Sequence, residues 1–399
     1  MKKSLLALAL TGLVCALSTG ANVAQAAKVY DKDGTSLDLY GRVQSVFYND
    51  KSSGVSNGDD KSASINTTGR LGFKLRSAIN PYVAGIAKAE WDVADGDNAP
   101  DGDQGFKSRY LWVGMDFGDF GQVTIGKQEH ALKYAVEQTD VFEDWGCVGL
   151  MGNDDKDEAV VKYAWSGYGV DAFLSYSFAK NAEKLDGAYY IDEEADLDYQ
   201  VSAALGYTSP DVLFGPIAAR AGYTHGEFAD VPDHSINTSA FATPNLTGSF
   251  YYDSFDQFAL GLSWGSLEQG PYLAAAYVDR TFDVNADAVR NSDGSSFVSS
   301  TDYSITGYEL VVGYTFTSGV FLVAGYEVQD FEFEDLDLHA ATVPVYLNWN
   351  INPNLNAWLE ARFDVGSDDD KDNDFENFDA ITGTDFTENI YSAGLRYSF

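Results

Sequence analysis

The sequence has few basic residues, two cysteines and no long apolar run, and each shortage excludes a class of protein. Lys and Arg number 25 against 61 Asp and Glu, which gives a formal net charge of −36. Nucleic-acid binding through phosphates relies on Lys and Arg, so we do not expect this chain to bind nucleic acid. No segment reaches the about 18 uninterrupted apolar residues that identify a membrane-spanning helix, so we expect none.

The first 26 residues have the pattern of a secretory signal peptide. Lys2 and Lys3 form a charged start, residues 5–17 are an apolar run, and residues 24–26 (AQA) form a small-x-small cleavage site. The apolar run is too short for a retained membrane anchor. We therefore expect cleavage before Ala27, which leaves residues 27–399 as the exported domain.

Export without a membrane helix leaves two classes: a soluble periplasmic or secreted protein, and a β-barrel of the outer membrane. Cys15 falls within the predicted signal peptide, so Cys147 remains alone and no intramolecular disulfide can stabilise the fold. The 25 Tyr and 25 Phe, with only 9 Pro, favour β-strands and the aromatic girdles of a membrane barrel.

The C-terminal stretch, residues 387–399 (TENIYSAGLRYSF), alternates with a period of two. Tyr391, Leu395, Tyr397 and Phe399 share an apolar face, and the opposite face is small or charged. This pattern predicts a strand with one apolar face. A terminal strand with a free edge would invite aggregation, so we expect it to pair on both sides by closing onto the first strand.

The same unit recurs from residue 34 onward: a strand-like run of about ten residues, followed alternately by a short turn and a long, often acidic connector, as in outer-membrane barrels. We therefore predict an all-β fold, a 16-stranded antiparallel transmembrane β-barrel with an apolar outside and a polar lumen. A soluble all-β protein remains the competing interpretation, but its outer face should carry Lys and Glu. We count about 16 runs, at residues 37–48, 66–79, one ending at 93, 107–117, 122–128, 159–165, 170–179, 199–208, 217–228, 253–266, 271–284, 304–317, 320–333, 340–349, 355–365 and 387–399.

Four motifs resemble the trimeric general diffusion porins of Gram-negative outer membranes. They are LDLYGRV (37–43), GRLGFK (69–74), SRYLWVGMDFGDFGQVTIGK (108–127) and YSAGLRYSF (391–399). The resemblance covers essentially the whole mature chain. It implies a 16-stranded homotrimeric barrel in the outer membrane, with a third loop, at about residues 129–158, folded into the lumen as a constriction.

In that family, acids of the constriction loop face a ladder of basic residues on the barrel wall. The family's Pro-Glu-Phe-Gly-Gly motif matches residues 143–147 (EDWGC). Glu143 therefore replaces the proline and adds a charge, and Cys147 replaces the second glycine with a residue whose Cβ is expected to change the loop path. The resemblance assigns the wall to Arg42, Arg70, Arg109 and Lys156, and the loop to Asp140, Glu143, Asp144 and Trp145.

Alternation supports part of that assignment independently. In the runs at 37–48 and 66–79, Arg42 and Arg70 fall on the polar face. In the run at 107–117, alternation leaves the face of Arg109 open. Acids on one side of a narrow passage and guanidinium groups on the other would create a lateral field that favours ions and dipolar solutes.

We therefore predict passive diffusion of ions and small hydrophilic solutes, with a cation preference suggested by the net acidity. Three alternatives stay open: a channel specific for sugars or oligosaccharides, for which Trp145 is the candidate contact; an adhesin or structural barrel; and an outer-membrane enzyme. No enzyme is expected, because the four histidines lie in no recognisable catalytic motif.

No cofactor or metal is expected either. Residues 95–103 and 368–374 have acid spacing similar to that of calcium loops, but neither carries the full ligand pattern. The resemblance implies outer-membrane lipid and lipopolysaccharide as surroundings, and the insertion machinery and periplasmic chaperones as assembly partners. The assembly signal that they would recognise consists of Tyr391, Leu395, Tyr397 and Phe399.

Overall fold

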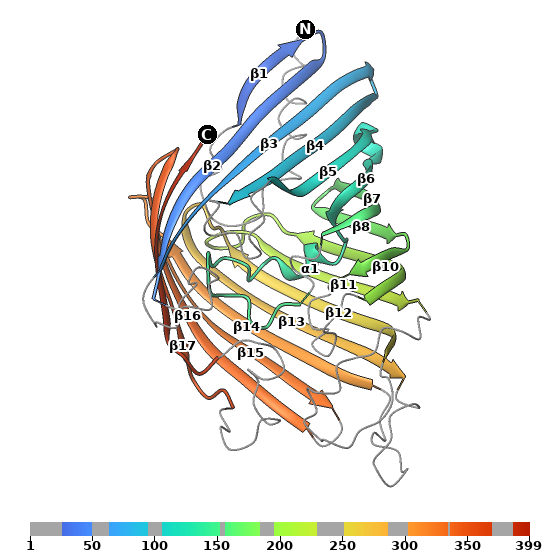
Figure 1. The fold of residues 1–399 in the computed structure, drawn as a ribbon. Helices are drawn as coiled ribbons and strands as arrows, with labels where there is room; N and C mark the ends of the chain where they lie inside the picture. The colour runs from blue at the N-terminus through green and yellow to red at the C-terminus, as the bar shows by residue number, and fades with distance from the viewer. Residues whose placement is uncertain are drawn as a thin grey trace.

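The chain folds into one antiparallel sheet that closes into a barrel (Figure 1). The computed structural model describes residues 26–49, 64–94, 106–151, 156–183, 195–229, 251–285, 302–333, 336–368 and 386–399. The predicted signal peptide, with Cys15, lies outside the described residues. Within them, no helix has the length and apolar character needed to cross a membrane.

Of the 18 strands in the described sheet, 16 are long and form the barrel wall, and β1 (Ala27–Lys32) and β9 (Lys180–Glu183) are short. The wall strands confirm the predicted architecture, with bounds that differ from the predicted ones by a few residues. They are β2 (Thr35–Tyr48), β3 (Ser64–Asn80), β4 (Val83–Ala94), β5 (Phe106–Asp116), β6 (Gln122–Glu129), β7 (Lys156–Gly167), β8 (Val170–Ser177), β10 (Ala195–Thr208), β11 (Ile217–Phe228), β12 (Tyr251–Gly265), β13 (Gly270–Asn285), β14 (Asp302–Thr315), β15 (Val320–Phe333), β16 (Leu336–Asn352), β17 (Leu355–Asp364) and β18 (Ile390–Ser398).

The last strand closes the barrel as predicted. β18 pairs with β17 on one side and with β2 on the other, in a register that runs from Ser392 opposite Tyr48 to Ser398 opposite Arg42. Phe399 and Gly41 then exchange two backbone hydrogen bonds of 2.9 and 3.0 Å. A Cβ at Gly41 would lie 2.7 Å from the Phe399 ring, so this closure requires glycine.

The two faces of the wall carry opposite chemistry. In β18, Leu395 and Tyr397 are exposed on the outside, whereas Ser392 and Arg396 are buried inside. The same alternation places apolar side chains outward along most other strands. Such an outer surface fits lipid and not water. The faces predicted for the C-terminal stretch are therefore confirmed.

β1 is an element that the strand count missed. It forms a hairpin with β2, from Lys32 opposite Thr35 to Ala27 opposite Leu39, on the edge of β2 that β18 uses farther along. Asp33 and Gly34, at the turn, both have positive φ, 53° and 77°, which is the geometry of a type I′ turn and its Asp-Gly signal.

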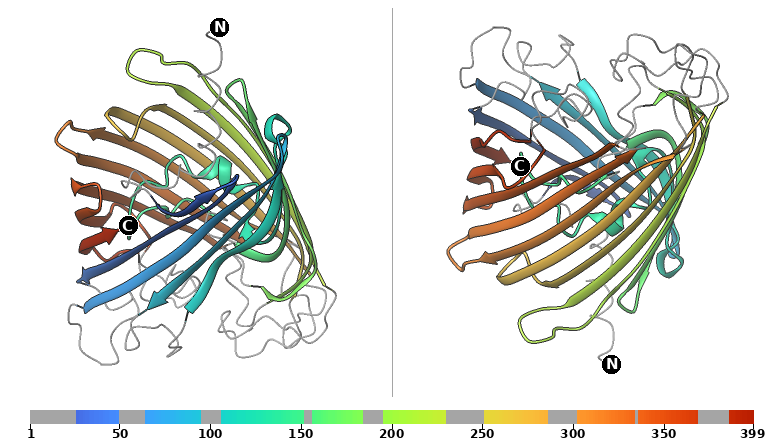
Figure 2. Two further views of the ribbon diagram at one scale, coloured as in Figure 1. Left: turned by 90° about the horizontal axis from the view of Figure 1, so that it is seen from above. Right: turned by 90° about the horizontal axis from the view of Figure 1, so that it is seen from below.

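Two short helices complete the described structure: η1 (Gly118–Phe120) in the turn between β5 and β6, and α1 (Lys133–Val136). α1 belongs to the connection between β6 and β7, which lies inside the ring of strands (Figure 2). The lumen loop, as we call residues 130–151, packs several apolar side chains against the wall, and Ala135, Val136 and Met151 are fully buried. The predicted loop in the lumen is therefore present, with a helix that the sequence interpretation did not include.

Candidate functional site

The first part of the lumen loop is fixed to the wall through α1. Arg220 of β11 donates from Nη1 to the carbonyl oxygen of Tyr134 at 2.9 Å and to Oε1 of Glu137 at 2.7 Å. The Tyr272 hydroxyl donates to the carbonyl oxygen of Gln138 at 2.6 Å. Burial raises the pKa of Glu137 to about 7, although Arg220 opposes the shift.

The tip of the lumen loop is held by one carboxylate of the wall. Glu360 of β17 accepts the backbone N–H groups of Glu143 at 2.8 Å, Asp144 at 2.9 Å and Trp145 at 2.7 Å. Three successive amides on one carboxylate form charge-assisted bonds, which are stronger than bonds between neutral groups. The position of the loop tip, the predicted constriction, is therefore fixed by β17.

Two further glutamates hold the segment after the tip. Glu327 of β15 accepts the Cys147 N–H at 2.8 Å, and Glu309 of β14 accepts the Gly149 N–H at 3.1 Å. The two glutamates lie opposite each other in the sheet, and both are buried. We call Glu309, Glu327 and Glu360 the anchor glutamates. Sequence reasoning missed them, although their signal was present as carboxylates at lumen-facing positions of predicted strands.

The structure gives Asp144 neighbours other than the arginines that the resemblance implies. Its carboxylate accepts the Trp358 indole N–H at 2.9 Å, the Ser392 hydroxyl at 2.5 Å and the Tyr48 hydroxyl at 3.1 Å. These donors lie on the wall, so Asp144 faces β2, β17 and β18. Burial raises its pKa. Asp140 accepts a hydrogen bond from the thiol of Cys147 at 3.3 Å.

Glu143, which stands at the family's proline position, is the loop acid that meets the basic wall. It accepts a hydrogen bond from Nη2 of Arg396, and its Oε1 lies 4.0 Å from Nη1 of Arg42. The additional charge is therefore compensated by guanidinium groups of β18 and β2.

Cys147, at the family's second glycine position, has a backbone conformation that favours glycine. Its φ is 73°, in the left-handed region that favours glycine. The expectation that its Cβ changes the loop path stays a prediction. Burial raises the pKa of the thiol. Trp145 packs edge-on against Tyr48, with the ring centroids 5.4 Å apart.

The arginines of the wall are interleaved with acids of β4. Arg70 donates from Nε to Oδ1 of Asp92 at 2.7 Å. Arg109 donates from Nη1 to Oδ2 of Asp92 and from Nε to Oε1 of Glu90, each at 3.1 Å. Arg42 lies directly opposite Arg70 in the sheet. The structure therefore gathers three of the four predicted wall residues, but with carboxylates between them.

A β-bulge explains why alternation did not assign Arg109 to a face. The register between β4 and β5 shifts from Glu90 opposite Tyr110 to Trp91 opposite Ser108, so Arg109 is the additional residue. Lys156 lies at the start of β7, opposite Glu129 in the register, and its Nζ is 5.9 Å from the centre of the Tyr110 ring. Lys88 lies over the same ring at 3.2 Å.

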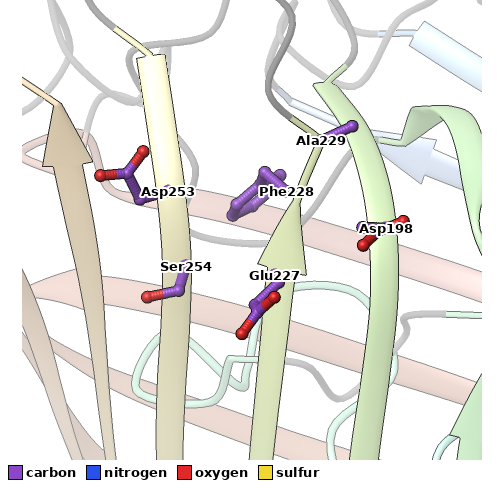
Figure 3. A pocket seen from close by; sticks show the side chains of 6 residues that line it. All are labelled: Asp198, Glu227, Phe228, Ala229, Asp253 and Ser254. Atoms are coloured by element: carbon purple, nitrogen blue, oxygen red, sulfur yellow. The ribbon is translucent and has the colours of Figure 1, made fainter.

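A separate cavity of about 470 Å³ lies at the start of β10 and β12 and the end of β11 (Figure 3). Three of its lining side chains are acidic. In the described part of the chain, no three His, Cys, Asp or Glu side chains are grouped in a way that could hold a metal ion. The lining residues are Asp198, Glu227, Phe228, Ala229, Asp253 and Ser254.

Comparisons with known proteins agree with this geometry. A family model described as Gram-negative porin matches residues 9–399. Outer membrane protein Omp-EA of Erwinia amylovora is 26% identical over 93% of this chain and 96% of its own length. Outer membrane porin C 2 of Shigella flexneri is 25% identical over 100% of both chains.

Solved structures show the same fold. OmpF of Salmonella typhi, in complex with daunomycin, matches with a TM-score of 0.67 at 17% identity, over 94% of this chain and 100% of that chain. The trimer form of Vibrio cholerae OmpT matches with a TM-score of 0.61 at 15% identity, over 92% and 100% of the two chains. The closed 16-strand barrel, the loop in its lumen and the match along nearly the whole sequence place this chain in the Gram-negative porin family, whose members form diffusion channels in the outer membrane.

Proposed function

We propose that this porin is a general diffusion channel that prefers cations. The observation that carries the proposal is the pairing of the arginine wall with carboxylates: Asp92 and Glu90 contact Arg70 and Arg109, and Glu143 contacts Arg396. An unpaired arginine ladder would attract anions. Because these arginines are paired with carboxylates, the excess of acidic residues, a net charge of −36 for the full sequence, favours cations over the rest of the passage.

The proposed passage lies between the lumen loop and the wall formed by β2–β5 and β7. In this assignment Arg42, Arg70, Arg109 and Lys156 supply its basic side, and Asp140, Glu143, Asp144 and Trp145 belong to the loop that narrows it. A water-filled passage with compensated charges sorts solutes by size and polarity, without a tight binding site. The comparisons do not favour a sugar-specific channel, and the proposal includes no enzymatic step.

Planar-bilayer recording in asymmetric KCl tests the proposal. The expected result is large, ohmic conductance steps with a reversal potential on the cation-selective side. An absence of conductance would contradict the diffusion channel, and an anion-selective reversal potential would contradict the cation preference alone.

We also propose that the functional unit is a homotrimer. The V. cholerae OmpT match was solved in a trimer form, and β2 and β5 of this chain present exposed Val43, Phe47 and Val113 outward. Apolar outer faces can pack on a second copy as well as on lipid. An unheated sample in SDS gel electrophoresis should migrate as a trimer and convert to monomer on boiling; monomer in both lanes would contradict the assembly.

We propose that the chain is cleaved before Ala27 and then escorted by periplasmic chaperones. The insertion machinery would recognise its C-terminal strand. Lipopolysaccharide would be among the lipids that surround the assembled barrel. Phe399 closes the barrel against Gly41, which supports a role in assembly. Deleting Phe399 should leave unassembled protein in the periplasm, and a normal trimer yield would refute that role.

A further inference from the structure

We infer that Asp92 is a selectivity-determining residue of this channel, located on the arginine wall and not on the lumen loop. The inference rests on the proposed diffusion function and names the group that sets its charge preference. The resemblance assigns the acidic contribution to the loop. The structure adds an acid within the basic ladder itself, at a position that sequence reasoning did not single out.

Asp92 bridges two guanidinium groups and still faces water. Its two oxygens accept from Arg70 at 2.7 Å and from Arg109 at 3.1 Å. Its side chain is 36% exposed, against 6% for Glu90, which contacts the same two arginines. Because Asp92 projects from a lumen-facing register position, the water that reaches it is the water of the passage.

The register makes Asp92 an acid among bases. A lumen-facing row crosses β2, β3, β4 and β5 in the order Arg42, Arg70, Asp92 and Lys107. Cross-strand neighbours are about 5 Å apart, so their charges act together on a passing ion. With Asp92 the row carries a net charge of +2, and without it +3.

Two acids of the loop, Asp144 and Glu143, are placed less favourably for this role. Asp144 is occupied by three wall donors, and the Glu143 side chain is 10% exposed and paired with Arg396. Asp92 is therefore more exposed to a permeating ion than Glu143 is, and Asp144 is turned toward the wall. The sign follows directly: neutralising Asp92 makes the wall more attractive to anions.

The test is the reversal potential of trimers in asymmetric KCl, for Asp92→Asn, Asp92→Glu and the matched control Asp119→Asn. Asp119 lies exposed in η1, so its replacement removes the same charge outside the lumen. Asp92→Asn should lower the cation-to-anion permeability ratio about two- to fourfold, the effect expected for one unit charge a few ångström from the ion path in salt. Asp92→Glu should keep the parent ratio, and Asp119→Asn should not change it.

Neutralising the partner arginine provides a second arm, in which the single variant does not depend on how well Asp92→Asn folds. Arg70→Gln should raise the ratio, and Arg70→Gln combined with Asp92→Asn should return it close to that of the parent. Conducting Asp92→Asn channels with an unchanged ratio would overturn the inference while leaving the diffusion function intact. If the parent protein itself shows no conductance, the proposed diffusion function is refuted instead.

Discussion

Two regions of the barrel wall use the same side-chain chemistry for different tasks. On β14, β15 and β17, the anchor glutamates are buried and accept backbone amides of the lumen loop. On β4, Glu90 and Asp92 accept guanidinium groups, and Asp92 remains open to water. A buried carboxylate that accepts hydrogen bonds from backbone amides fixes the position of a loop. A solvent-exposed carboxylate among arginines changes the electrostatic potential along the path of an ion.

Removing an anchor glutamate should have the largest effect, because these residues hold the lumen loop against the wall. Glu360→Leu leaves the amides of Glu143, Asp144 and Trp145 without their acceptor, and each lost bond to a charged group costs about 1.5–3 kcal/mol. We expect the loop tip to leave the wall. Single-channel recording should show altered conductance with increased open-channel noise.

The control for Glu360→Leu is Glu227→Gln, which changes a glutamate at the end of β11, in the lining of the cavity in Figure 3 and away from the lumen loop. Its single-channel trace should match that of the parent. A quiet Glu360→Leu channel of parental conductance would show that the apolar contacts of the loop suffice to hold its tip.

The base of the loop should respond to pH through Glu137. Burial raises its pKa from 4.5 to about 7, so the docked state binds a proton more tightly than the undocked state. This contribution to stability is fully present below pH 4.5 and is lost as pH rises through about 7, by at most about 3 kcal/mol. The protection factors of the Ala135 and Val136 amides, which are exchange rates corrected for intrinsic base catalysis, should therefore be higher at pH 5 than at pH 8.

Glu137→Gln separates this effect from a general response to pH. The variant has no titrating carboxyl at that position, so most of the pH dependence of the protection factors in α1 should disappear. An equal pH dependence in the variant and the parent would assign the effect to another group.

The strained backbone at Cys147 predicts a smaller effect. A residue with a Cβ in the left-handed region costs roughly 1–2 kcal/mol relative to glycine. The free energy of unfolding of Cys147→Gly should therefore exceed that of Cys147→Ala by about 1 kcal/mol. The measurement is the thermal midpoint of barrel unfolding in detergent, which should be higher for Cys147→Gly. Comparing the two variants removes the thiol bond to Asp140 from both. Equal midpoints would mean that the loop relaxes around this position.

The smallest expected effect concerns Asp144. Family resemblance predicts that replacing Asp140 and Asp144 with Asn lowers cation preference, but Asp144 is turned toward Tyr48, Trp358 and Ser392. Asp144→Asn alone should therefore change the permeability ratio less than Asp92→Asn does. A larger shift for Asp144→Asn, measured as a reversal potential, would place the controlling charge back on the loop.

Alternation predicted most of the wall, because the period-two pattern and the requirement for a closed edge act locally on every strand. It did not find β1, although Asp33-Gly34 carries a hairpin signal that is clear in retrospect. It also left Arg109 without a face, because a bulge adds one residue to β5. Both differences come from local irregularities that interrupt a periodic pattern.

Less of the candidate site than of the barrel wall could be predicted from the sequence. Arg42, Arg70 and Arg109 could be selected from the family motifs, but their partners on β4 depend on cross-strand register. The anchor glutamates are separated from their loop partners by more than 150 residues of sequence. Such contacts arise from barrel closure, so no local pattern specifies them.

The most direct test of the account is to record Glu360→Leu and Asp92→Asn side by side in asymmetric KCl, with conductance and reversal potential measured on the same channels. The account predicts that Glu360→Leu changes mainly conductance and noise, and that Asp92→Asn keeps the conductance while its reversal potential moves toward anions. If both variants change the same quantity in the same way, anchoring and selectivity are not separate tasks of the two groups of carboxylates.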